Sequence, residues 1–199
     1  MFAESRIADF LEAVAAKTPT PGGGSVSALV GALGAALGVM TARFSESTEA
    51  ERALDGLKRE LLALADADAE AYGMVNTAMS LPKDSDETKR RRKEALQNAL
   101  SEASEVPLRG MTLGVKGLEA LARLAPTCNR HLTSDLAGAA GFLAAAVSGC
   151  AENVRINAAA LKDRERGERL EGERGRLLGE AEALRARIAR EVEKLYAAK

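Results

Sequence analysis

A run of three glycines precedes a long uncharged segment, and this is the first place where the sequence could hold a ligand. The run lies in Thr20–Ser25 (TPGGGS), and residues 26–42 after it carry no Asp, Glu, Lys or Arg. Because Ser25 is a good N-cap residue, we expect a helix to start there, after a glycine turn. A helix start presents unpaired backbone N–H groups and a positive dipole end, which suit an anionic or carbonyl group. The alternative is a plain linker; the run lacks the features of a P-loop or a dinucleotide fingerprint.

Two carboxylates lie in an alanine-rich segment, Ala65–Tyr72 (ADADAEAY). Asp66 and Asp68 are two residues apart, so on a helix they point to different faces and at most one faces the core easily. A carboxylate buried among alanines has a raised pKa and can exchange protons near neutral pH, as a general acid or base does. The alternative is a solvated helix face that carries both side chains.

Further polar residues interrupt the apolar pattern of the C-terminal half. Asn153 and Asn157 are spaced i, i+4 and therefore share one face of a helix. An asparagine inside an apolar helix either bonds a backbone group or lines a polar pocket, and both roles are open here. Asn129, Ser134 and Asp135 form another polar group around an expected loop.

The composition argues against several classes of protein. The 199 residues have a formal net charge of −1, 3% aromatic residues and no Trp, so a nucleic acid partner is not expected. Cys128, Cys150 and His131 are too few for an ordinary structural zinc site, and no metal site is expected. The N-terminus does not have the pattern of a signal peptide, so we expect a cytoplasmic protein. The uncharged segments 26–42 and 136–151 favour close packing inside a bundle over membrane spans.

The elements that position these residues are all expected to be helices. Ala, Leu, Glu and Arg dominate, and the alternation typical of strands is absent. We expect Pro107 to kink or restart the fourth helix, and Ser134 or Thr133 to cap the fifth. Residues 162–199 form a charged C-terminal helix of dense Arg and Glu with sparse Leu and Ile, typical of a solvated or partner-facing surface. The sequence thus predicts an all-α, single-domain bundle of about five or six helices over residues 1–199, with helices at 5–16, 25–44, 48–79, 86–124, 134–161 and within 162–199.

Several of these motifs occur together, in this order, in a known family. From about Phe2 to Lys162 the sequence resembles the formiminotetrahydrofolate cyclodeaminase family, which includes methenyltetrahydrofolate cyclohydrolases. The resemblance rests on Pro21–Val26 (PGGGSV), Asp66–Tyr72 (DADAEAY), Leu81–Lys83 (LPK), Ser134–Leu136 (SDL), and Asn153-Val154 with Asn157.

The resemblance implies an all-helical fold, a homodimer, and a folate site at the glycine turn and the helices around it. It also implies that Asp68, the second aspartate of its motif, is the catalytic acid/base group. Asp66 and Glu70 are expected to support the helix or pair with a basic residue, and His131 is expected to be a loop residue. The turn would hold folate through backbone N–H groups, lysines including Lys89 would attract its glutamate tail, and the Asn and Asp side chains would line the pterin side. The substrate-binding residues expected in this way are Gly22, Gly23, Gly24, Ser25, Lys83, Asn129, Asp135, Asn153 and Asn157.

The implied reaction cyclises formimino-tetrahydrofolate to methenyl-tetrahydrofolate and releases ammonia. The substrate supplies its own nucleophile, a neighbouring folate amine, so no metal, cofactor or covalent residue is expected. The protein would need one group that moves protons and a pocket that holds the two nitrogens in attacking geometry.

Two alternatives stand beside this function. A methenyltetrahydrofolate cyclohydrolase uses water and formyl-tetrahydrofolate in a related ring closure. A non-enzymatic helical interaction module would explain the charged C-terminal segment, although it needs neither the glycine turn nor Asp68. The 199 residues contain no part resembling the formiminotransferase domain of the bifunctional members, so the resemblance does not decide which one-carbon reaction is catalysed.

Overall fold

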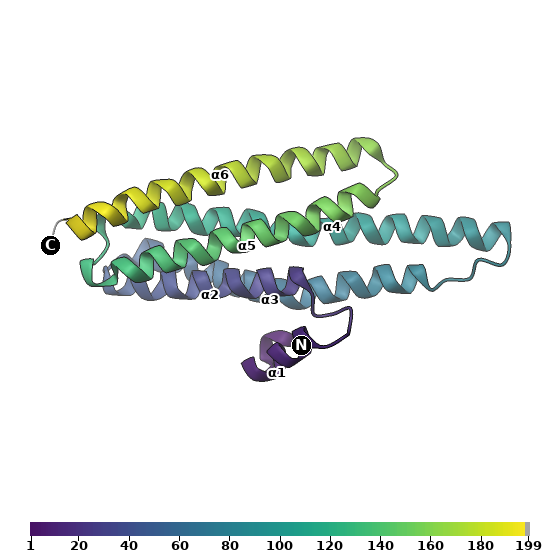
Figure 1. The fold of residues 1–199 in the computed structure, drawn as a ribbon, viewed down its shortest axis with the longest axis horizontal. Coiled ribbons are helices and arrows are strands. Elements are labelled where there is room, and N and C mark those ends of the chain that lie inside the picture. Colours follow the sequence, from purple (N-terminus) through teal and green to yellow (C-terminus); the bar gives the residue numbers. More distant parts are fainter. Residues whose placement is uncertain (198–199) are drawn as a thin grey trace.

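The computed structural model describes residues 1–197, which form six α-helices and three short 3-10 helices, with no strand in that range. The all-α fold predicted from the sequence is therefore confirmed. Figure 1 shows the five long helices lying side by side along the molecule, with the short first helix set apart on one flank. The α-helices are α1 (Ile7–Ala15), α2 (Gly23–Phe44), α3 (Thr48–Met79), α4 (Asp86–Leu124), α5 (Thr133–Ala160) and α6 (Arg164–Ala197); the 3-10 helices are η1 (Phe2–Glu4), η2 (Ala125–Thr127) and η3 (Arg130–Leu132).

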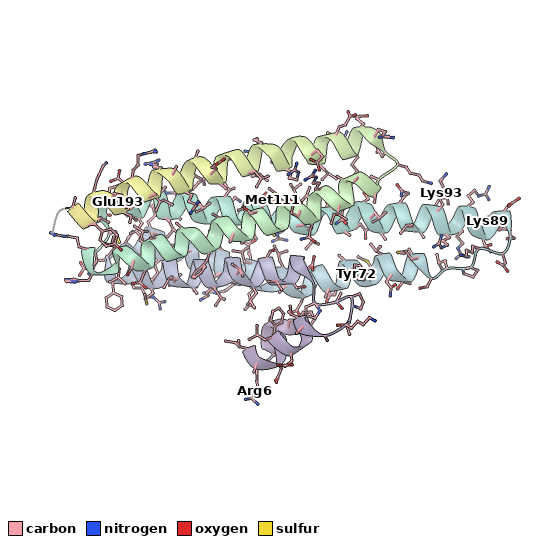
Figure 2. The ribbon with its side chains drawn as sticks, in the orientation of Figure 1. Arg6, Tyr72, Lys89, Lys93, Met111 and Glu193 are labelled. Atoms are coloured by element: carbon pink, nitrogen blue, oxygen red, sulfur yellow. The ribbon has the colours of Figure 1, made fainter. Side chains whose placement is uncertain are left out.

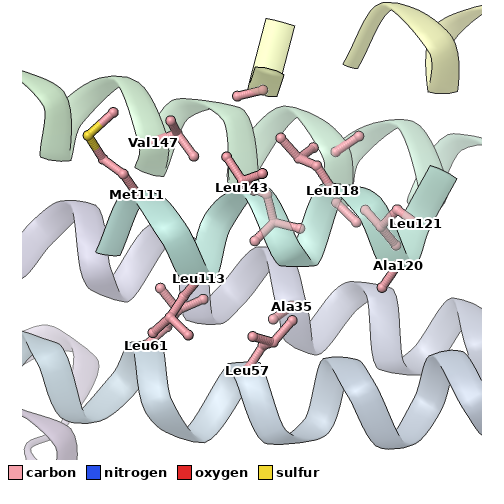
Figure 3. Packing of buried hydrophobic residues seen from close by; sticks show 14 of the residues in the cluster. Ala35, Leu57, Leu61, Met111, Leu113, Leu118, Ala120, Leu121, Leu143 and Val147 are labelled. Carbon is pink, nitrogen blue, oxygen red and sulfur yellow. The ribbon is translucent and has the colours of Figure 1, made fainter. Parts of the chain in front are cut away.

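The core lies where α2, α3, α4 and α5 meet. The uncharged α2 packs against α3 and α5, α4 also packs against both of these helices, and α6 covers α4 and α5. Leucines fill the space between the layers, as Figure 3 shows for Leu61, Leu118 and Leu143. Burying such side chains is the main source of stability for a bundle whose two cysteines are both free.

The two small-residue helices α2 and α5 pack closely on each other, as predicted. A Cβ atom added at Gly34 would lie 3.0 Å from the backbone nitrogen of Leu143, and one added at Gly149 would lie 2.1 Å from Ser27 Oγ. A side chain at Gly34 would press on the α5 backbone, and one at Gly149 would require the Ser27 hydroxyl to move, so glycine allows the close packing of the two helices. Both α2 and the segment Arg130–Ala160 are also long and apolar enough to cross a membrane by length and composition alone.

The helices differ from the sequence-based expectation in three places, at the starts of α2 and α5 and at Pro107 inside α4. The first residue of α2 is Gly23 and its N-cap is Gly22, so Ser25 lies inside the first turn and is not the cap. The N-cap of α5 is Leu132, and Thr133 instead donates its hydroxyl to the Arg130 carbonyl, 2.7 Å away. The fourth helix is neither broken nor restarted at Pro107, which lies buried within the continuous α4.

The N-terminal helix α1 is held mainly through its flanking residues. The Phe2 and Phe10 rings meet edge to face with centroids 5.6 Å apart, and the backbone N–H of Phe2 donates to Asp66 on α3. Phe10 is 5% exposed, whereas Ile7 and Leu11 on the same side of this helix are 75% and 60% exposed. The apolar side of α1 is therefore only partly covered by the described residues.

The charged C-terminal helix α6 belongs to the bundle. Leu170, Leu177 and Ile188 form its buried stripe against α4 and α5, and ion pairs such as Arg176 with Glu173 and Glu180 lie beside this stripe. The expectation of an amphipathic helix is met, and its apolar side is occupied by this chain's own helices.

Candidate active site

A pocket of about 340 Å³ opens where the glycine turn meets the middle of the bundle. It lies between the N-terminus of α2 and the facing sides of α3, α4 and α5, so four helices contribute to it. Figure 2 places one lining residue, Tyr72, on α3 away from both ends of the bundle. The lining residues are Pro19, Thr20, Gly22, Gly23, Gly24, Asp68, Ala71, Tyr72, Val75, Leu100, Ala103, Asn153, Ile156 and Asn157.

Asp68 is fixed to the first turn of α2. Its Oδ2 atom accepts a hydrogen bond from the Ser25 backbone N–H at 2.8 Å and lies 3.0 Å from the Ser25 hydroxyl. The same hydroxyl lies 2.9 Å from the Ala65 carbonyl, one turn earlier on α3. Because the first N–H groups of a helix have no intrahelical acceptor, the carboxylate of Asp68 serves as the cap that the sequence assigned to Ser25.

Burial makes Asp68 easier to protonate than an ordinary aspartate. Desolvation raises its pKa above the ordinary value of 3.8, and the two hydrogen bonds from Ser25 only partly counteract this shift. The neighbouring Cys150 thiol is buried, and desolvation with the charge of Asp68 raises its pKa to about 12. Cys150 therefore stays protonated near neutral pH, and Asp68 is the group of this pair that can exchange protons.

Gly24 lets α2 approach Asp68. A Cβ atom at this position would lie 2.0 Å from Asp68 Oδ1 and 2.5 Å from its Cγ, which no real side chain could do without displacing the carboxylate. At Gly23 the nearest atom would be Asn153 Nδ2 at 3.7 Å, an ordinary contact. The glycine run therefore contains one position where close approach demands glycine and one where it does not.

Asn153 and Asn157 line the opposite side of the pocket, on α5. The Asn153 Nδ2 atom donates to the Gly149 carbonyl one turn earlier, and the Asn157 Nδ2 atom donates across to the Ala103 carbonyl on α4, both at 3.0 Å. The two roles that the sequence left open for these asparagines are therefore both present, since each amide bonds a backbone group and also lines the pocket.

Apolar side chains form the remaining walls. Ala71, Val75, Leu100 and Ala103 come from α3 and α4, while Tyr72 and Ile156 are partly exposed side chains at the pocket. Apolar walls with a few placed polar groups suit a flat heterocyclic ligand. Sequence reasoning did not single out Leu100, Ala103 or Ile156, because their place here depends on how α4 and α5 pack and no local pattern signals it.

Four predicted binding residues do not line this pocket within one chain: Ser25, which is buried and holds Asp68 instead, and Lys83, Asn129 and Asp135. Lys83 is exposed in the connection after α3, at the end of the α3–α4 pair where Figure 2 shows Lys89. Asn129 bonds the Phe44 carbonyl and the Ser45 hydroxyl at the other end of α2, roughly 30 Å from Gly23 along the helix axis. Asp135 lies in the first turn of α5 at that same end. Within one chain, Asn129 and Asp135 therefore do not share the pocket that Asn153 and Asn157 line, and the expected role of Lys83 toward a glutamate tail stays a prediction.

The remaining candidates have structural partners or are solvated. Asp66 accepts hydrogen bonds from the backbone N–H groups of Phe2 and Ala3, so it supports the N-terminal segment and pairs with no basic side chain there. Glu70 is exposed, and His131 is an exposed residue of η3 whose N–H donates to Asn129 Oδ1. Within residues 1–197, no group of three or more His, Cys, Asp or Glu side chains is placed to hold a metal ion.

Comparison with known proteins places the chain in a family. The family model described as formiminotransferase-cyclodeaminase matches residues 6–176. A methenyltetrahydrofolate cyclohydrolase from Methylorubrum extorquens is 36% identical over 203 residues, covering 94% of this chain and 96% of that protein. A formimidoyltransferase-cyclodeaminase from Gallus gallus is 40% identical over 168 residues, covering 77% of this chain, which spans only 30% of that longer relative.

A solved structure agrees with this placement over nearly the whole chain. The formiminotetrahydrofolate cyclodeaminase from Thermotoga maritima superposes with a TM-score of 0.87 at 28% identity, covering 98% of this chain and 100% of its own. Fold, family model and relatives therefore agree with the resemblance seen in the sequence motifs. The chain belongs to the formiminotransferase-cyclodeaminase family, whose members process folates in one-carbon metabolism.

Proposed function

We propose that the protein cyclises formimino-tetrahydrofolate to methenyl-tetrahydrofolate and releases ammonia, with Asp68 as the acid/base residue. The observation that carries this proposal is a half-buried carboxyl group with a raised pKa in a pocket with apolar walls, beside the open end of α2. Such a group can both accept and return a proton in one catalytic cycle.

The chemistry follows from this placement. The folate N10 amine attacks the formimino carbon on N5, so an N10–C bond forms and a tetrahedral intermediate results. Asp68 accepts the proton that N10 loses and delivers it to the formimino nitrogen, whose bond to carbon then breaks. With one further proton from solvent, the products are ammonia and the methenyl cation. The electrons of the broken bond leave with the nitrogen, so no oxidant or reductant is consumed.

The pocket itself would supply most of the positioning. The first turn of α2 offers backbone N–H groups to a carbonyl oxygen of the pterin, while the walls from α3 and α4 fit its flat ring. Holding N10 and the formimino carbon at attacking distance lowers the entropy cost of ring closure. Asp68 is itself held by Ser25, so it needs little reorganisation to meet the reacting nitrogens.

Methenyltetrahydrofolate cyclohydrolase activity is the second candidate. It is favoured by the relative from Methylorubrum extorquens, which bears this name and matches almost the full length of both chains. In this reaction Asp68 would accept a proton from water as its oxygen adds to the methenyl carbon. The bond from that carbon to one ring nitrogen then breaks, the nitrogen takes up the proton that Asp68 holds, and the added hydroxyl group loses its proton to solvent as formyl-tetrahydrofolate forms.

One assay separates the candidates. Purified protein is given formimino-tetrahydrofolate or, separately, methenyl-tetrahydrofolate in buffer, and the absorbance of the methenyl compound is followed together with released ammonia. Fast methenyl formation with stoichiometric ammonia supports the cyclodeaminase. Fast methenyl loss with little formimino turnover replaces it with the cyclohydrolase. If neither rate exceeds the uncatalysed one and neither folate binds in calorimetry, the enzyme proposal fails and an interaction module becomes the better reading.

A further inference from the structure

Pro107 has an unusual position for a proline, inside the buried part of a continuous helix. Helix α4 runs from Asp86 to Leu124 without interruption at this residue. A proline has no backbone N–H, so it cannot donate the bond that residue i normally gives to the carbonyl of residue i−4. The carbonyl left without its helical donor is that of Ala103, which lines the pocket.

The freed carbonyl is used by a pocket residue from another helix. The Asn157 Nδ2 atom, on α5, donates to the Ala103 oxygen at 3.0 Å, although the two residues are 54 positions apart in the sequence. A carbonyl oxygen can only accept, so this bond determines which end of the amide faces α4. One N–H of the NH₂ group is engaged there, so the amide oxygen of Asn157 lies at the end of the side chain that faces away from the Ala103 carbonyl.

The neighbouring amide, on Asn153, also donates from its Nδ2 atom to a backbone carbonyl, that of Gly149. Its NH₂ group faces Gly23 in the glycine turn. The Asn157 oxygen and the Asp68 carboxylate are both hydrogen-bond acceptors, so together they favour a ligand edge that carries N–H donors. The aminopyrimidine part of a pterin has such an edge.

We propose that Pro107 is a positioning residue: it frees the Ala103 carbonyl to hold the Asn157 amide, so that the Asn157 oxygen accepts a hydrogen bond from the aminopyrimidine N–H groups of a folate. The folate part of this inference rests on the proposed function, whereas the bond between Asn157 and Ala103 does not. Asn157 thereby contacts the bound folate directly, and Pro107 affects binding only through Asn157.

Kinetics of four variants test the proposal. Pro107→Ala restores an N–H that competes for the Ala103 carbonyl, so KM for the folate should rise about five- to tenfold while kcat changes less than about twofold, the size expected for one hydrogen bond. Asn157→Ala should raise KM at least as much. The double variant should have the KM of Asn157→Ala alone, because the two changes remove the same interaction. Pro126→Ala, at the exposed 3-10 turn beyond α4, is the matched control and should leave KM unchanged.

Thermal unfolding excludes a merely structural effect. Alanine is far better than proline inside a helix, so Pro107→Ala should keep or raise the melting temperature while it weakens binding. An unchanged KM in Pro107→Ala, or KM effects that multiply in the double variant, would overturn the proposal.

A ligand-free measurement separates this inference from the proposed function. The side-chain NH₂ signals of Asn157, identified by their loss in Asn157→Ala, should exchange with solvent several-fold more slowly than those of the exposed Asn98, and faster in Pro107→Ala. If this pattern is found in a protein that neither binds nor converts folates, the positioning bond stands and the proposed function fails. If folates are converted but Asn157 exchanges as fast as Asn98, the positioning role fails.

Discussion

At the scale of single residues, Asp68 combines two demands that pull its pKa in opposite directions. As the cap of α2 it accepts hydrogen bonds that favour its charged form, and as a half-buried group it is desolvated, which favours its neutral form. Desolvation is the larger effect. A carboxyl group in this balance is held in place by the helix end and still able to take up a proton, which is what the proposed reaction requires.

Asp68→Asn should abolish most of the activity without unfolding the protein. Asparagine can still accept the Ser25 N–H bond as a cap, but it cannot transfer a proton, so kcat should fall about 10²–10⁴-fold. The measurement is turnover of the better folate substrate, with circular dichroism to verify the fold. Asp66→Asn is the control, because Asp66 bonds Phe2 and Ala3 away from the pocket, and it should keep near-normal turnover. Equal activity in Asp68→Asn and the parent protein would rule out the acid/base role.

The raised pKa of Asp68 also predicts how stability changes with pH. Between the ordinary value of 3.8 and the raised folded-state pKa, the native protein binds more protons at this group than the unfolded chain does. The contribution of Asp68 to stability is therefore greatest below the unfolded pKa and is lost as pH rises through the folded one. Urea unfolding of the parent protein and Asp68→Asn from about pH 4 to pH 8 should show the parent losing stability relative to the variant as pH rises. Parallel curves would mean that the pKa of Asp68 is not raised.

How far single residues could be predicted depends on whether their partners are local. Asp68 and Asn157 stood out as polar residues in alanine-rich or apolar segments, but only the family resemblance selected Asp68 over Asp66. The same resemblance assigned Asn129 to the pterin side and Lys83 to the glutamate tail, and nothing in their local sequence states that they lie near the ends of long helices. The role of Ser25 also changed, because its partner Asp68 comes from a helix 43 residues away and no local rule finds that contact.

At the scale of elements, the pocket depends on how closely the first turn of α2 approaches α3. Gly24→Ala would place a Cβ atom against the Asp68 carboxylate, so the side chain must move out of its position. We expect the variant to fold, since alanine is a good helix former, and to lose at least about 10² in kcat, as expected when an acid/base group is misplaced.

Gly23→Ala is a closely matched control for that prediction. It changes the adjacent residue in the same way, but its Cβ meets only Asn153 Nδ2 at an ordinary 3.7 Å. The kcat values of the two variants should therefore differ widely, with Gly23→Ala within a few-fold of the parent protein, whereas KM can change in both because both glycines line the pocket. Similar activity in both would show that the carboxylate tolerates displacement and is not placed by this contact.

The sequence predicted the helices better than it predicted their boundaries. Helical periodicity and strong helix formers are properties of each segment, so all six α-helices were expected close to where they lie. The fourth helix does not restart at Pro107, where the Ala103 carbonyl accepts a hydrogen bond from Asn157 of another helix. The expected caps at Ser25 and at Ser134 or Thr133 were wrong, because Asp68 caps α2 and the N-cap of α5 is Leu132, while Thr133 bonds the preceding 3-10 turn.

At the scale of the whole molecule, the pocket and the outer helix α6 are separate. Every lining residue belongs to α2, α3, α4, α5 or the segment before α2, whereas α6 only covers the outer faces of α4 and α5. Substitutions in α6 should therefore change the stability of the bundle without changing KM or kcat.

Leu177→Ala tests that separation. Leu177 is 1% exposed in the interface between α6 and the bundle, so its truncation should leave a cavity and lower the free energy of unfolding by about 2–5 kcal/mol. The KM and kcat of the remaining folded protein should stay unchanged, because no residue that lines the pocket belongs to α6. Glu182→Ala, at an exposed position of the same helix, should change stability by less than about 0.5 kcal/mol. If Leu177→Ala raised KM at temperatures well below its unfolding transition, α6 would have to take part in shaping the pocket through α4 and α5, and the two would not be independent.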